Sequence, residues 1–219
     1  IRITLNMPSK AAYYLRVPDV PSAMSLWVNG VLHYQRGIVS NLAELEVPKF
    51  GPEVISLPPS DQYDLILHIS NHHHKDGGIW HNFLIADKAH KTELREQSKT
   101  IDVIIFTFIM LASIYLLFVN LSRQGHISHL LFAVFIWAIA LRSVMVGERA
   151  AYDFVSGVSW ENWQRFEHLL LFLALPSFVY FFHRFFAIKK IYFAHFVLMV
   201  SMVLAIGTIV YPALVFTNF

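Results

Sequence analysis

Cysteine is absent from the 219 residues, which excludes a disulfide framework and any cysteine-ligated metal site. Charge is also scarce: charged residues make up 15% of the chain and hydrophobic residues 56%, whereas soluble domains carry about 25% charged residues. Net charge is only +2 and no basic cluster is present, so we expect no nucleic-acid partner. The sequence also lacks a Gly-rich phosphate loop, a serine nucleophile elbow and a kinase or cyclase signature. We therefore expect neither a catalytic site nor a cofactor in these residues.

The apolar excess is concentrated after residue 100, and it begins with Asp102–Leu121, DVIIFTFIMLASIYLLFVNL. A helix rises about 1.5 Å per residue, so roughly 20 apolar residues cross a hydrocarbon core about 30 Å thick. Further runs of the same kind follow. We predict a multi-pass, all-α helical bundle in a lipid bilayer over residues 102–219, entered through a polar connector at 89–101. The four predicted spans are 103–121, 127–146, 169–186 and 191–211.

Residues 1–88 contain short runs of β character separated by turn residues. Asn29-Gly30 lies between two such runs and is a strong signal for a two-residue hairpin turn. No crossover helices separate the runs, which favours an antiparallel sandwich over a parallel sheet. The predicted strands are 1–5, 11–17, 25–28, 31–35, 54–57, 63–70 and, more weakly, 79–85.

Lysine and arginine in the short loops predict the orientation of the spans. Arg123 follows the first span, and Arg184, Lys189 and Lys190 lie between the third and fourth. These two loops lie on the same side and are therefore predicted to be cytoplasmic. The sandwich and the loop around 147–168 then face outward.

Ser70–His81, SNHHHKDGGIWH, is the most unusual stretch of the β region. On a strand, His72 and His74 would share one face, and neutral imidazole is a common zinc or copper ligand. The alternative is a solvated loop in which Asn71 and Gly77-Gly78 make the turn. No spaced set of further ligands accompanies the histidines, so we predict no metal and keep these two only as weak candidates.

An extracytoplasmic ligand, a small molecule or a carbohydrate, is the other interpretation of this region. Trp27, Trp80 and Tyr34 could stack on a sugar ring while polar side chains bond its hydroxyls; the alternative is that these aromatic residues belong to the core. The candidate ligand-binding residues are Trp80, Asn71, Asp76, His72, His74, Asn29 and Tyr34.

Four ionisable residues lie near the ends of the predicted second and third spans: Arg142, Glu148, Arg149 and Glu167. Charged groups at membrane depth are costly and tend to pair or to line a cavity. Near a helix end, however, they can extend to the lipid headgroups instead. We favour the headgroup interpretation for these four.

Several short motifs, in this order, are shared with one bacterial receptor family. They are Leu26–Gly30 (LWVNG), Leu65–Asn71 (LILHISN), Gly77-Gly78-Ile79, Leu141-Arg142, Arg165–His168 and His183–Phe186. Nearly the whole chain resembles the seven-transmembrane receptors with diverse intracellular signalling modules (7TMR-DISM). That resemblance implies a periplasmic jelly-roll domain, similar to galactose-binding and carbohydrate-binding folds, before seven helices in the bacterial inner membrane. It also implies homodimerisation and a cytoplasmic output domain such as a histidine kinase, diguanylate cyclase or phosphatase.

Because Ile1 lies inside a strand pattern and Phe219 follows soon after the fourth span, we expect the chain to be part of a longer protein. The main hypothesis is a membrane receptor that senses an extracytoplasmic ligand and signals inward. The alternatives are a transporter component with an exported β domain and a membrane enzyme acting on lipids or glycans through His72, His74 or Glu148.

Overall fold

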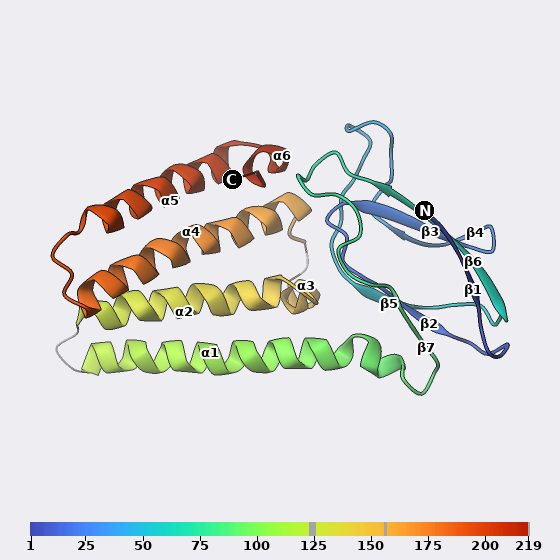
Figure 1. The fold of residues 1–219 in the computed structure, drawn as a ribbon, viewed down its shortest axis with the longest axis horizontal. Helices are drawn as coiled ribbons and strands as arrows, with labels where there is room; N and C mark the ends of the chain where they lie inside the picture. The colour runs from blue at the N-terminus through green and yellow to red at the C-terminus, as the bar shows by residue number, and fades with distance from the viewer. Residues whose placement is uncertain (123–125, 156, 219) are drawn as a thin grey trace. The chain divides into compact units, whose positions relative to one another are not determined.

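A computed structural model describes residues 1–122, 126–155 and 157–218. The chain divides into a β unit, Ile1–Thr100, and a helical unit, Ile101–Thr217 (Figure 1). This division lies within two residues of the start of the predicted membrane region.

The β unit contains two antiparallel sheets, one in the order β1-β6-β3-β4 and one in the order β5-β2-β7. The strands are β1 (Arg2–Asn6), β2 (Tyr14–Val17), β3 (Ala23–Val28), β4 (Val31–Arg36), β5 (Glu53–Ser56), β6 (Gln62–Ser70) and β7 (Leu84–Ala86). Six of the seven predicted strands are confirmed within a few residues. The seventh is shortened from 79–85 to three residues, because Gly77-Gly78 and Trp80 belong to an irregular loop before it.

The β3–β4 hairpin turns at Asn29-Gly30, as predicted. Both residues have positive φ, 52° and 82°, which is the requirement of a type I′ turn and the reason for an Asn-Gly pair there. The Asn29 side chain also accepts a hydrogen bond from the backbone N–H of Asp64 at 2.8 Å. The turn is thereby attached to β6, the neighbouring strand of the same sheet.

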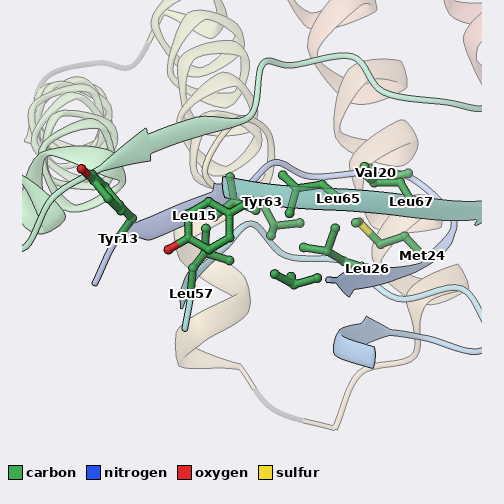
Figure 2. Packing of buried hydrophobic residues seen from close by; sticks show 11 residues of the cluster. Tyr13, Leu15, Val20, Met24, Leu26, Leu57, Tyr63, Leu65 and Leu67 are labelled. Carbon is green, nitrogen blue, oxygen red and sulfur yellow. The ribbon is translucent and has the colours of Figure 1, made fainter. Parts of the chain in front are cut away.

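A hydrophobic core lies between the two sheets (Figure 2). Leu15 comes from β2, Leu26 from β3 and Tyr63 and Leu65 from β6, and each is at most 4% exposed. Because both sheets contribute to one buried cluster, the β unit is a sandwich.

Among its described residues, the helical unit contains four helices long and apolar enough to cross a membrane, which makes the chain a multi-pass membrane protein. They are α1 (Glu96–Ser122), α2 (Ile127–Met145), α4 (Trp160–Phe185) and α5 (Tyr192–Val210), with short helices η1 (Lys91–Leu94), α3 (Ala150–Phe154) and α6 (Ala213–Phe216). The predicted connector is therefore partly helical, since η1 and the first turns of α1 occupy most of it.

Helix α4 begins at Trp160, nine residues before the predicted start of the third span at 169. Ser159 caps it by accepting a hydrogen bond from the backbone N–H of Asn162 at 3.3 Å, and Glu161 in the first turn favours the same helix end. Hydropathy detects only the apolar part of a helix. The polar first turns of α4 are therefore missed by a search for membrane spans.

Small residues bring the helices together. Ala138 of α2, Ala174 of α4 and Ala194 of α5 are at most 2% exposed, as expected where membrane helices pack by close backbone approach. Phe132 of α2 stacks on Phe181 of α4 with ring centroids 4.6 Å apart.

Candidate functional site

The loop after β6, Asn71–Trp80, is held in one shape by its own hydrogen bonds. The Asn71 amide donates to the His74 carbonyl at 2.8 Å and accepts from the His74 backbone N–H at 3.1 Å. The backbone N–H of Asp76 donates to Nδ1 of His74 at 3.0 Å. These bonds favour the turn interpretation of the histidine run, and they leave His74 only 9% exposed.

His72 contacts a buried carboxylate that the sequence analysis did not identify. Glu46 is 4% exposed, and its Oε1 accepts from the backbone N–H of His72 at 3.2 Å. Nε2 of His72 lies 3.8 Å from Glu46 Oε2 and 3.2 Å from the carbonyl oxygen of Ser40. Within residues 1–122, 126–155 and 157–218, no group of three or more His, Asp or Glu residues is arranged to hold a metal ion.

Trp80 is the exposed aromatic residue of this loop, at 48% exposure. Its ring meets the edge of the His74 ring with centroids 5.7 Å apart. Asn71 and Asp76 hydrogen-bond to His74, whose ring Trp80 contacts, and an exposed indole is a surface on which a sugar ring can stack. We name Asn71, His74, Asp76 and Trp80 the Trp80 loop.

Asn29 and Tyr34 do not belong to the Trp80 loop. Asn29 pairs with Asp64 near the start of β6, whereas Asn71 follows its end. Tyr34 lies opposite Leu26 and packs against the core, and burial raises the pKa of its hydroxyl to about 12. Trp27 stacks on His68 with ring centroids 4.4 Å apart. The predicted sugar-binding residues therefore separate into different parts of the β unit.

The ionisable residues of the helical unit form ion pairs with one another. The Glu167 carboxylate of α4 lies 3.3 Å from Arg142 Nη2 and 3.6 Å from Arg149 Nη1. Arg149 also donates to the Met145 carbonyl at 2.9 Å. We name Arg142, Arg149 and Glu167 the Glu167 cluster, which ties α2 and the start of α3 to α4.

The burial of these side chains bears on the two interpretations. Arg149 and Glu148 are 7% and 6% exposed, so the surrounding protein covers most of both side chains; the headgroup interpretation of the four residues stays a prediction. The Arg142 side chain is 37% exposed. A carboxylate between two guanidinium groups is the arrangement expected where water is limited.

Arg165 lies at the same end of the helical unit as the Glu167 cluster, and the sequence did not indicate its contacts. It donates to the Thr208 carbonyl at 2.7 Å and to the Ile209 carbonyl, in the last turn of α5. It also pairs with Glu161 at 2.8 Å. The Glu161–Arg165 spacing of four residues predicts only the local pair; the bond to α5 spans 43 residues of chain.

No protein-family model, no curated protein and no solved structure matches this chain.

Proposed function

We propose that the chain is the sensing and first membrane part of a bacterial inner-membrane receptor. Its β unit lies outside the membrane, as a jelly-roll-like domain, and binds a small carbohydrate at the Trp80 loop. Helix α1 carries the binding event toward the other end of the helical unit and to a cytoplasmic output domain.

The connection between the sandwich and α1 is the observation that carries this proposal. Helix η1 begins five residues after β7 ends, and its Leu94 is buried at 8% exposure. The Lys91 ammonium lies 4.6 Å from the centre of the Tyr14 ring on β2. Asp87 and His90 lie between β7 and η1, and Oδ1 of Asp87 is 2.7 Å from Nδ1 of His90.

The connector thus contacts the sandwich through Lys91 and buries Leu94, and α1 begins two residues after Leu94. The first residues of α1, Glu96–Thr100, belong to the β unit, and the rest of the helix belongs to the helical unit. A helix shared by two units transmits a displacement of one to the other, provided that the ligand binds two arrangements with different affinity.

The location of charge supports a receptor better than a transporter. The acidic residues of the helical unit lie within the first two turns or so of α1 and α4, or between α2 and α4: Asp102, Glu148, Asp153, Glu161 and Glu167. Transport sites usually place ionisable groups near the bilayer midplane. Arg184, Lys189 and Lys190 support a cytoplasmic location for the opposite end; Arg123, predicted on the same side, lies outside the described residues.

The test is hydrogen–deuterium exchange of the full chain in nanodiscs, with and without a panel of neutral mono- and oligosaccharides. A bound sugar is expected to slow exchange at the Trp80 loop and to change it at Lys91–Thr100. Trp80→Ala should weaken binding roughly 5- to 150-fold, because stacking on an aromatic side chain contributes on the order of 1–3 kcal/mol.

Trp27→Ala is the matched control, because it removes an indole of the same unit that stacks on His68 instead. Binding that survives Trp80→Ala but is lost in Trp27→Ala would place the ligand elsewhere. Sugar binding that leaves exchange at Lys91–Thr100 unchanged would contradict signalling through α1.

A further inference from the structure

The helical unit has two ends of opposite electrical character. No Asp or Glu lies between Asp102 and Glu148, and none follows Glu167. Every carboxylate side chain of this unit therefore lies toward the end that carries the Glu167 cluster. The opposite end, where α2 begins and α4 ends, carries Arg184, Lys189 and Lys190 without any acidic residue to neutralise them (Figure 1).

A cavity of about 280 Å³ opens at this basic end, between the last turns of α4 and the start of α5. Its wall consists almost entirely of apolar and aromatic side chains, with two nitrogen-bearing exceptions, His183 and Lys190. The apolar lining residues are Phe178, Val179, Phe182, Ile188, Phe193 and Ala194. Its volume is close to the lower limit of ligand pockets, roughly 300 Å³.

His183 shows what kind of group the cavity accepts. Both of its ring nitrogens are buried, and neither has a hydrogen-bond partner among the residues that the structure describes. An imidazole always carries at least one N–H donor, and a buried donor without an acceptor is costly. A rotation of the imidazole into the cavity would bring this donor to an acceptor oxygen beside Lys190.

We propose that this cavity, the His183–Lys190 pocket, binds one anionic phospholipid of the surrounding leaflet. The phosphate oxygens accept from His183 and pair with the Lys190 ammonium, while an acyl chain packs against Phe182 and Phe193. Charge complementarity and the apolar lining together identify the occupant, because a free phosphate would leave the aromatic wall without a partner. The proposal does not depend on what the β unit binds.

The experiment uses the 219-residue chain released from nanodiscs of equal phosphatidylcholine and phosphatidylglycerol, with retained lipids counted by native mass spectrometry. One phosphatidylglycerol is expected to remain bound in preference to phosphatidylcholine. Lys190→Gln should reduce that preference about fivefold, which corresponds to roughly 1 kcal/mol for one basic residue at an anionic surface.

Lys189→Gln is the matched control, because Lys189 carries the same charge in the same loop but does not line the cavity. It should change the preference by less than about twofold. Val179→Phe, which fills the cavity and leaves every charge in place, should also displace the lipid. Circular dichroism of each variant confirms that its helices are intact.

Equal losses in Lys189→Gln and Lys190→Gln would show a diffuse surface attraction and overturn the proposal. Retention of the lipid in Val179→Phe would overturn it as well, because the acyl chain would then lie outside the cavity. Displacement by inorganic phosphate alone would identify a phosphate site instead of a lipid site.

Discussion

Individual buried polar residues of the sandwich are attached to distant backbone groups. Arg36, at 3% exposure, donates to the Pro18 carbonyl at 2.9 Å and to the Gly51 carbonyl. Asp19, at 7% exposure, accepts from the Gly51 backbone N–H at 3.0 Å. These bonds hold the long irregular segment between β4 and β5, which has little regular structure of its own.

Tyr34 gives a prediction at the scale of one residue. Burial raises the pKa of its hydroxyl from 10.0 to about 12. Since the pKa is raised in the folded state, the protonated hydroxyl's contribution to stability is complete below pH 10 and is lost as the pH rises to about 12. Denaturant titrations of the β unit's unfolding at increasing pH should show this loss.

Tyr34→Phe should remove this part of the alkaline destabilisation and the corresponding step in tyrosinate absorbance. The same alkaline loss in Tyr34→Phe and in the parent chain would show that another group is responsible.

At the scale of elements, α4 joins the parts of the helical unit. Its polar first turns present Glu167 to Arg142 and Arg149, and they present Arg165 to the end of α5. Its apolar remainder packs on α2 and α5 through small and aromatic side chains. One helix therefore combines membrane packing with ionic connections at a single end.

Glu167→Gln is predicted to destabilise the helical unit by on the order of 3 kcal/mol. The change removes a carboxylate that pairs with Arg149, whose side chain is 9% exposed, and breaking a buried pair is costly. Thermal unfolding of the chain in nanodiscs measures the effect.

Glu161→Gln is the control, because Glu161 is 41% exposed and pairs with Arg165 on the same helix. Exposed pairs of this spacing contribute about 0.5 kcal/mol or less. Similar losses of stability in Glu167→Gln and Glu161→Gln would mean that the Glu167 cluster is not a buried ion-pair network.

At the scale of the whole molecule, the two units are stabilised by different interactions. The sandwich is held by a water-excluding core between its sheets. The helical unit exposes many large apolar side chains, among them Phe108, Phe118 and Phe196, which a bilayer would cover. A substitution in the core of one unit should therefore leave the unfolding transition of the other unit unchanged.

Leu26→Ala tests this independence. Leu26 is fully buried in the sandwich, and Leu→Ala in a core costs about 2–5 kcal/mol. Hydrogen exchange should accelerate across Ile1–Ser70 and remain unchanged in α2, α4 and α5. Leu42→Ala is the control, because Leu42 is 61% exposed; acceleration throughout the helical unit would contradict two separate cores.

The sequence alone was sufficient for the elements that depend on local pattern. Alternation of apolar residues located most strands, Asn29-Gly30 located the hairpin, and apolar run length located four helices, because each signal lies within neighbouring residues. It placed the start of α4 too late, since a polar helix end carries no hydropathy signal.

Tertiary structure alone decided which side chains meet. Glu46 and His72 are 26 residues apart, and Arg165 and Thr208 are 43 apart; such contacts depend on sheet register and helix packing, which no local pattern specifies. The same reason explains why Asn29 and Trp80, plausible partners in the sequence, lie in different parts of the sandwich. Composition determined that the chain enters a membrane, and packing determined where its charges are paired.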